Sequence, residues 1–216
     1  MHALDLFAPN LLQSNLLQSN LLQLIADAEG GIRYWPGFAD PHEADVWFEV
    51  LRANAAWQSE RRKMYDRIVD VPRLLAAYRT DALPPELPLA DLLARVQALL
   101  PAPYNAIGMN LYRDGQDSVA MHNDKLHTIV PGHPIALVSL GNPRRMMIRA
   151  KTGDREAKPR MVSLSNHIDL APGSLLAMSH ASQLTHKHGI PKTVHAMGSR
   201  MSVVFRVRPK GRVADY

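Results

Sequence analysis

Residues 104–112 read Tyr-Asn-Ala-Ile-Gly-Met-Asn-Leu-Tyr, a stretch in which apolar and polar side chains alternate. Successive side chains of a β-strand point to opposite faces, so every second residue shares a face. Ile107, Met109 and Leu111 then form one apolar face, and Asn110 and Tyr112 lie on the other. The turn signal Asp114-Gly115 follows, so a strand is predicted to end near Tyr112.

Five later segments are also short, mainly apolar runs bounded by turn residues, and they are predicted to be strands as well. They are residues 135–140, 145–150, 161–164, 174–178 and 200–208. Upstream, Asp40-Pro41-His42-Glu43 has the cap, the first-turn proline and the acidic residue of a helix start. Apolar spacing predicts a second helix over residues 89–100. The pattern predicts an α+β fold with N-terminal helices packed on a β-sandwich or barrel.

The composition of the 216 residues is that of an ordinary globular protein, with 46% hydrophobic and 21% charged residues. Cysteine is absent, which excludes disulfides, thiolate catalysis and zinc–thiolate sites, so any metal must bind to His, Asp or Glu. No apolar run reaches the roughly 18 residues of a membrane span, and the first residues lack the basic segment of a secretory signal. We therefore expect a cytoplasmic protein that does not enter membranes, with a monomer as the simplest state.

The N-terminal residues 10–23 contain the unit Leu-Leu-Gln-Ser-Asn twice and begin it a third time. On a helix a five-residue period rotates by about 140° per repeat, so the leucine pairs do not form one stripe. We interpret residues 1–24 as an N-terminal extension, with a binding helix as the alternative, and residues 25–216 as a single domain.

Two tripeptides place a histidine and an aspartate two residues apart: His122-Asn-Asp124 and His167-Ile-Asp169. On a strand both side chains would point to one side. A redox-active Fe(II) site needs two imidazoles and one carboxylate on one face, so a third ligand must come from a later strand. His186 and His188 lie far enough beyond Asp124 for several strands to intervene, whereas they follow Asp169 closely. We therefore favour the first tripeptide and expect the second to be a loop.

The segment Arg200-Met-Ser-Val-Val-Phe-Arg206 places two arginines six residues apart on a predicted strand. Six is an even number, so both guanidinium groups face one side and the apolar residues face the other. Arginine is the natural bidentate partner of a carboxylate. The alternative is a pair of exposed charges on an amphipathic strand.

Taken together, seven blocks in this order resemble the AlkB family of Fe(II)- and 2-oxoglutarate-dependent dioxygenases. The blocks are Val71-Pro-Arg73, Asn110-Leu-Tyr112-Arg-Asp-Gly115, His122-Asn-Asp124, Pro134 to Gly141, Pro172-Gly-Ser-Leu-Leu176, His188-Gly-Ile-Pro-Lys192 and Arg200 to Arg206. The resemblance implies a double-stranded β-helix, the jelly roll or cupin-like fold. It also implies Fe(II) as the metal, 2-oxoglutarate as cosubstrate and O2 as oxidant.

Residue by residue, the resemblance implies that His122, Asp124 and His188 bind iron. His188 is preferred over His186 because it directly precedes the Gly-Ile-Pro-Lys block. The resemblance further implies that Arg200 pairs with the distal carboxylate of 2-oxoglutarate and that three residues complete the cosubstrate pocket: Arg206, Asn110 and Tyr112. The implied reaction yields succinate and CO2, hydroxylates an N-methyl group and releases formaldehyde.

The chain departs from the family where the family recognises a damaged base. Members that repair alkylated nucleic acids carry an acidic residue two positions after the iron-binding aspartate, and here that position is Leu126, followed by His127. Tyr65 and Tyr78 are candidates to stack on an extruded base, and Arg73 of the Val-Pro-Arg block is a further candidate contact.

Two basic clusters bear on the substrate, with the formal net charge of +5 permitting a polyanionic partner. One comprises Arg61, Arg62, Lys63 and Arg67, and the other comprises Arg144, Arg145, Arg149, Lys151, Arg155, Lys158 and Arg160. They are interpreted either as contacts to phosphates or as solvated surface.

The sequence thus predicts a dioxygenase of the AlkB type that demethylates N-alkylated bases in single-stranded DNA or RNA. One alternative is the same chemistry on a protein or small molecule. A second alternative is a non-catalytic β-helix that binds metal or ligand. Formation of succinate separates this second alternative from the two enzymatic readings.

Overall fold

Two antiparallel sheets form the centre of the computed structural model, which describes residues 20–64, 66–151 and 167–211. In spatial order the larger sheet contains β1 (Leu22–Ile25), β2 (Ile32–Trp35), β10 (Ser174–Met178), β7 (Ile135–Gly141), β12 (Arg200–Arg206), β5 (Ala106–Tyr112), β4 (Arg67–Arg79) and β3 (Gln58–Met64). The smaller sheet contains β6 (Val119–His122), β11 (His186–Ile190), β8 (Arg144–Ala150) and β9 (His167–Leu170).

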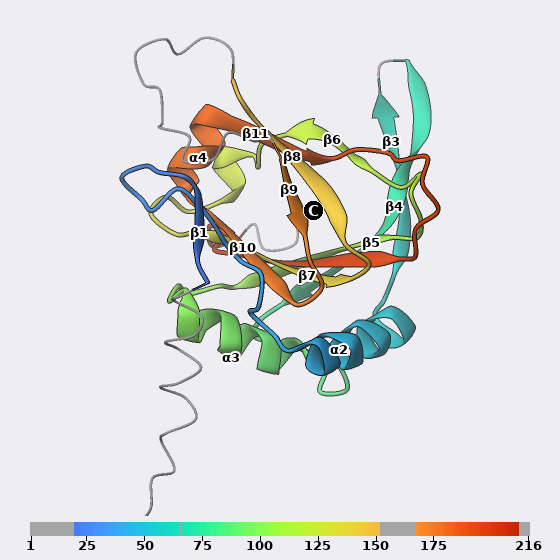
Figure 1. The fold of residues 1–216 in the computed structure, drawn as a ribbon, viewed down its shortest axis with the longest axis horizontal. Helices are drawn as coiled ribbons and strands as arrows, with labels where there is room; N and C mark the ends of the chain where they lie inside the picture. The colour runs from blue at the N-terminus through green and yellow to red at the C-terminus, as the bar shows by residue number, and fades with distance from the viewer. Residues whose placement is uncertain (1–19, 65, 152–166, 212–216) are drawn as a thin grey trace, which may run out of the picture.

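The helices are α2 (Pro41–Asn54), α3 (Leu89–Leu99) and the short α4 (His180–Thr185), with one 3-10 turn at Leu126–Thr128. Figure 1 shows α2 and α3 along one side of the larger sheet and the strands of the smaller sheet on the other side. The arrangement is consistent with the jelly-roll fold that the resemblance implies.

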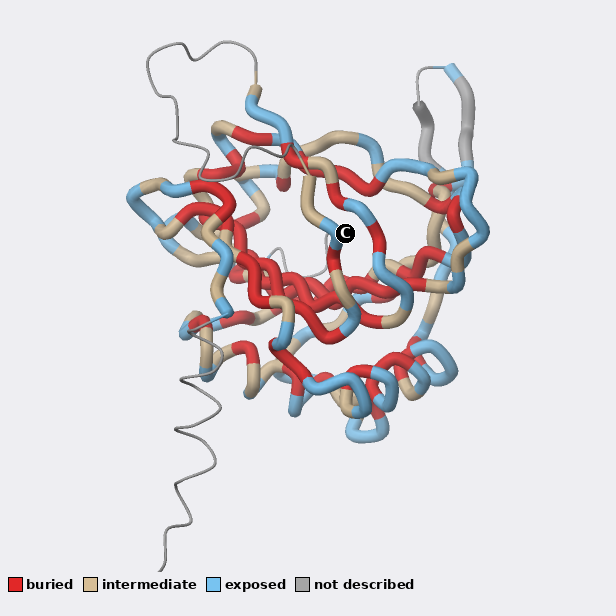
Figure 2. The backbone as a smooth tube through the Cα atoms, viewed as in Figure 1, coloured by how far each residue is buried: buried red, intermediate tan, exposed pale blue. Residues whose placement is uncertain are grey.

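Strand β12 shows why both faces of the larger sheet are buried. Met201, Val203 and Phe205 belong to a hydrophobic cluster shared with residues of α2 and α3. Val204, on the opposite face, belongs to a second cluster that joins residues of both sheets. The buried segments therefore run through the middle of the molecule (Figure 2), and the polar residues of this second face lie between the sheets.

Helix α2 begins as its sequence predicts. Asp40 is the N-cap and accepts a hydrogen bond from the N–H of Glu43, and Pro41 occupies the first turn. The predicted second helix corresponds to α3. Five of the predicted strands, β5, β7, β8, β10 and β12, lie within two residues of their expected limits, and residues 161–164 lie outside the described residues.

Other parts of the fold differ from the sequence prediction. Residues 167–170 form strand β9 and pair with β8, so the loop expected there is wrong. The long hairpin of β3 and β4 was not predicted, because charged residues interrupt any apolar alternation in residues 58–70. Strand β1 begins at Leu22, inside the range assigned to the N-terminal extension. None of the helices among the described residues is long and apolar enough to span a membrane.

Candidate metal and cosubstrate centre

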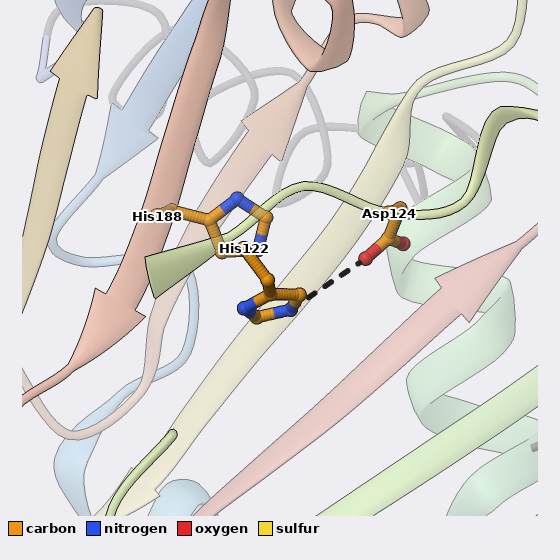
Figure 3. A group of neighbouring side chains, drawn as sticks. All are labelled: His122, Asp124 and His188. Carbon is orange, nitrogen blue, oxygen red and sulfur yellow. Dashed lines mark ion pairs between the residues drawn. The ribbon is translucent and has the colours of Figure 1, made fainter. Parts of the chain in front are cut away.

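Three potential metal ligands meet at one end of the smaller sheet. His122 is the last residue of β6, Asp124 follows two residues later, and His188 lies on β11. His188 pairs in register with His122, and the ring centroids are 4.5 Å apart. Ligand atoms of the three residues all lie within 4.8 Å of one another, and Figure 3 shows the side chains converging.

Hydrogen bonds orient these ligands. The Nδ1 atom of His122 lies 3.0 Å from the carbonyl oxygen of Ala120, which leaves Nε2 on the side of Asp124, 3.9 Å from its Oδ1. The Nε–H of Arg206 donates to the other carboxylate oxygen, Oδ2, at 2.6 Å. One oxygen of Asp124 is thus fixed by arginine, and the other faces the histidines.

The protonation states suit a divalent cation. Burial alone would raise the pKa of Asp124, but the charge and hydrogen bond of Arg206, together with the two histidines, lower it to about 2. Burial and the neighbouring His122 lower the pKa of His188 to about 4. At neutral pH the carboxylate is therefore charged and the His188 imidazole is neutral, as metal binding requires.

The two-residue spacing of His122 and Asp124 has a different origin from the one predicted. Strand β6 ends at His122, so Asp124 is not on the strand. The alternation of side chains along a strand therefore does not explain why the two side chains lie together. Among the described residues the other tripeptide contributes to no such group of ligands. Its Asp169 forms an exposed ion pair with Arg145, the residue opposite it on the paired strand β8.

Arg200 provides the second half of the centre. Its side chain is completely buried, and its Nε–H donates to the hydroxyl oxygen of Ser139 at 3.2 Å. Within the described part of the chain, Nη1 and Nη2 have no hydrogen-bond partner. The guanidinium carbon lies 5.1 Å from the centre of the Tyr112 ring. Burial lowers the pKa of Arg200 to about 10, so it stays charged at neutral pH. Two buried unpartnered donor nitrogens on a cation fit a carboxylate that the described residues do not supply.

Asn110 and Tyr112 lie on the same face of the sheet as Arg200. In the register of β12 and β5, Arg200 pairs with Tyr112 and Ser202 pairs with Asn110. The amide of Asn110 donates from Nδ2 to Ser202 Oγ at 3.3 Å and accepts from Arg73 Nε at 2.7 Å. This face therefore forms one polar surface between the sheets. Near it lie the three potential metal ligands, and on it lies the buried guanidinium of Arg200.

The remaining sequence candidates are distributed differently. Arg73 is partly buried, and it donates hydrogen bonds to Asn110 Oδ1 and to the carbonyl oxygen of Ser118. Tyr78 is not brought to this face, because it lies on the side of β4 that packs toward the helices, and its hydroxyl accepts the N–H of Ala56. Leu126 is partly buried against the second hydrophobic cluster and His127 is exposed. Tyr65 lies outside the described residues.

The basic clusters are also divided. Arg144 is buried and donates to the carbonyl oxygens of Asp114, Asp117 and Pro191, so it holds loops together and is unavailable to phosphates. Arg145 is paired with Asp169, and Arg61 is paired with Asp70. Arg155, Lys158 and Arg160 lie outside the described residues.

Sequence reasoning missed three residues that contact the centre. Ser202 shares the parity of Arg200 and Arg206 on β12, so the same argument would have found it. Ser139 occupies the matching register position on β7, which only the strand pairing reveals. Gln183 accepts the main-chain N–H of Asp124, and no pattern in the sequence signals that contact.

Comparison with known proteins agrees with this architecture. A family model described as the 2OG-Fe(II) oxygenase superfamily matches residues 31–206. The chain therefore belongs to this superfamily of oxygenases, whose name specifies Fe(II) and 2-oxoglutarate.

Individual relatives narrow the class. Alpha-ketoglutarate-dependent dioxygenase alkB homolog 3 of Rattus norvegicus is 30% identical over 195 residues, covering 84% of this chain and 66% of the relative. The Homo sapiens protein of that name is 30% identical over 200 residues, with shares of 84% and 68%. DNA oxidative demethylase ALKBH2 of Homo sapiens is 27% identical over 179 residues, with shares of 76% and 68%. The chain belongs to the AlkB family and spans about two thirds of the length of these relatives.

Proposed function

We propose that this protein is an Fe(II)- and 2-oxoglutarate-dependent dioxygenase that oxidatively demethylates N-alkylated bases in single-stranded nucleic acid. One observation carries the proposal: the structure contains both a group of three potential metal ligands, His122, Asp124 and His188, and a buried guanidinium, that of Arg200, whose terminal nitrogens have no partner among the described residues. In this proposal the fold is a double-stranded β-helix with N-terminal helices packed on it, and residues 25–216 act as one domain.

The residues of the chain divide the work between them. His122, Asp124 and His188 would hold the metal through two imidazoles and one carboxylate. Arg200 would bind the distal carboxylate of 2-oxoglutarate, while Tyr112, Asn110 and Arg206 line the same polar face. Bound Fe(II) with 2-oxoglutarate and O2 supplies the oxidant that hydroxylates the methyl group, and the product then loses formaldehyde.

The charges of the site support these roles. Arg206 keeps Asp124 ionised, since its guanidinium bonds directly to the carboxylate. The second hydrophobic cluster includes residues of both sheets, among them Tyr112 and Val204 of the same face. The chain thus provides a charged and oriented site in which Asp124, His188 and Arg200 are buried and His122 is partly exposed.

A pair of variants tests the class of enzyme. Asp124→Ala removes the sole carboxylate of the ligand group and should abolish succinate production from 2-oxoglutarate. Asp169→Ala, in the other His-x-Asp tripeptide, breaks an exposed ion pair and should retain it. Activity that survives in the first variant and disappears in the second would reassign the metal site, and no succinate from the wild type would favour a non-catalytic protein.

The relatives named above motivate the choice of nucleic acid, since one of them is called a DNA oxidative demethylase. A single-stranded oligonucleotide carrying 3-methylcytosine should be demethylated faster than the same strand in a duplex. In the single strand the base is already unpaired, so its extrusion requires no free energy for breaking a base pair. Raising the salt concentration should raise the KM of the strand, since phosphate contacts release counterions. Equal demethylation rates on the single strand and the duplex would contradict the proposed preference for single strands.

A further inference from the structure

Gln183 connects helix α4 to the candidate metal centre. The side chain is 1% exposed, and its Oε1 accepts the main-chain N–H of Asp124 at 3.0 Å. Asp124 lies beyond the end of β6, so the strand ladder does not position this N–H. The contact joins two segments 59 residues apart in sequence.

The carboxamide of Gln183 is itself held in one orientation. Its Nε2 donates to Ser182 Oγ at 3.2 Å, which leaves Oε1 directed at Asp124. The main-chain carbonyl of Gln183 accepts a hydrogen bond from Lys151 Nζ at 2.7 Å. Both ends of the residue are therefore fixed, and its acceptor oxygen is not free to rotate away.

Helix α4 is in turn tied to the turn between β1 and β2. Ser179, the N-cap of α4, donates from Oγ to Asp27 Oδ2 at 2.6 Å, and the N–H of Ala181 donates to Glu29 Oε2 at 2.8 Å. The other oxygen of Asp27 accepts the N–H groups of Glu29 and Gly31 at 2.8 and 2.7 Å. Gly31 has φ 68°, and a Cβ there would lie 1.8 Å from a main-chain oxygen, so this turn admits glycine alone.

We infer that Gln183 is a positioning residue for the metal ligand Asp124, and that α4 and the Asp27–Gly31 turn support it. The inference rests on the proposed function only in taking Asp124 as a ligand. Arg206 fixes the side chain of Asp124 through Oδ2, and Gln183 fixes its main chain through the N–H. Together the two contacts set where Oδ1 lies relative to the histidines, because a residue held only by its carboxylate could still turn about that bond.

The decisive comparison is between Gln183→Met and Gln183→Glu. Methionine has a similar length and no carbonyl acceptor, so the Asp124 N–H loses its partner. Glutamate keeps an acceptor oxygen at the same reach. In the protein without 2-oxoglutarate or nucleic acid, the methionine variant should show faster hydrogen exchange at the Asp124 amide. Its Mn(II) dissociation constant should rise by about 10-fold or more, the usual effect of losing a contact that orients a ligand.

Gln183→Glu should restore both the slow exchange and the Mn(II) affinity. Gln97→Met is the matched control, since Gln97 is also a helical glutamine, on α3, and its amide donates to the main-chain carbonyl of Ala102 just beyond the end of that helix. It should leave Mn(II) binding unchanged. Wild-type Mn(II) affinity in Gln183→Met, or equal losses in the methionine and glutamate variants, would overturn the inference.

Asp27→Ala tests the support from the turn. It releases Ser179 and should also speed exchange at the Asp124 amide, by a smaller factor. Unchanged hydrogen exchange at the Asp124 amide would show that the Asp27–Gly31 turn does not support Gln183. Because Mn(II) binding and exchange are measured without turnover, these results stand even if the protein releases no formaldehyde.

Discussion

At the scale of single residues, the centre depends on how buried charges are paired. Asp124 is 8% exposed, and its carboxylate is stabilised by a hydrogen-bonded arginine. Arg200 is completely buried, yet among the described residues its two terminal nitrogens lack a partner. An unsatisfied buried cation is costly, so the arrangement is best explained by a ligand that brings the missing carboxylate.

Arg200→Lys tests this explanation. Lysine keeps the charge but loses the planar fork that binds a carboxylate through two hydrogen bonds. The apparent KM for 2-oxoglutarate should rise by about 10- to 100-fold, the equivalent of losing a hydrogen bond to a charged group. The KM for nucleic acid should change little. The exposed Arg145→Lys is the control, and an effect confined to the nucleic-acid KM would reassign Arg200 to that partner.

Leu126 gives a second prediction at this scale. Its side chain cannot accept a hydrogen bond from an exocyclic amine, and sites that hydrogen-bond their substrate discriminate far more strongly than apolar ones. The rates on 1-methyladenine and 3-methylcytosine should therefore differ by only about a few-fold. Formaldehyde release from matched oligonucleotides measures this ratio. Strong discrimination that disappears in His127→Ala would show that His127 recognises the base instead.

At the scale of secondary-structure elements, the sequence predicts the strands whose apolar and polar residues alternate. It does not predict contacts between segments that are distant in the sequence. The strands with a clean apolar face, such as β5 and β12, were located, and so was α2 through its cap. Strands β1, β2, β3, β4 and β9 were missed, because short segments and segments interrupted by charged residues carry little alternation. The shared face of Asn110 and Tyr112, and that of Arg200 and Arg206, followed from parity. The contacts of Ser139 and Gln183 depend on pairing and packing between distant segments.

The pairing of β6 with β11 depends on Gly189. A Cβ at this position would lie 2.9 Å from the main-chain oxygen of Val119 and 3.1 Å from that of Ala120, so alanine would force β6 away. Since β6 carries His122 and β11 carries His188, Gly189→Ala should weaken Mn(II) binding by about 10-fold. Mn(II) titration followed by electron paramagnetic resonance measures the change. Gly37→Ala is the control, because a Cβ there meets no atom within 4 Å. Unchanged affinity in Gly189→Ala would contradict the prediction.

At the scale of the whole molecule, the buried ligands couple stability to pH. Unfolded histidine takes up a proton near pH 6.5, but burial keeps His188 neutral until about pH 4. Between these values the unfolded chain binds more protons than the folded one, so stability falls as the pH falls. Burial lowers the pKa of His186 in the same direction, and Asp124 adds a further loss as the pH falls from its ordinary value toward about 2.

The metal-free protein should therefore lose about 3 kcal/mol of unfolding free energy through His188 between pH 7.5 and 4, since one pKa unit is worth about 1.4 kcal/mol. Urea denaturation at a series of pH values measures the loss. The variant His188→Asn should show a flatter dependence than the wild type. The same slope in both proteins would show that His188 is not the group responsible.

The central claim is that the charged face between the sheets oxidises a methylated base with 2-oxoglutarate. The most direct test follows succinate and formaldehyde together, using Fe(II)-loaded protein and single-stranded oligonucleotides with 1-methyladenine, with 3-methylcytosine or without a lesion. The account predicts that succinate and formaldehyde form in equal amounts, that both depend on the lesion, and that both are lost in Asp124→Ala. Equal succinate with and without the lesion, and no formaldehyde, would contradict it.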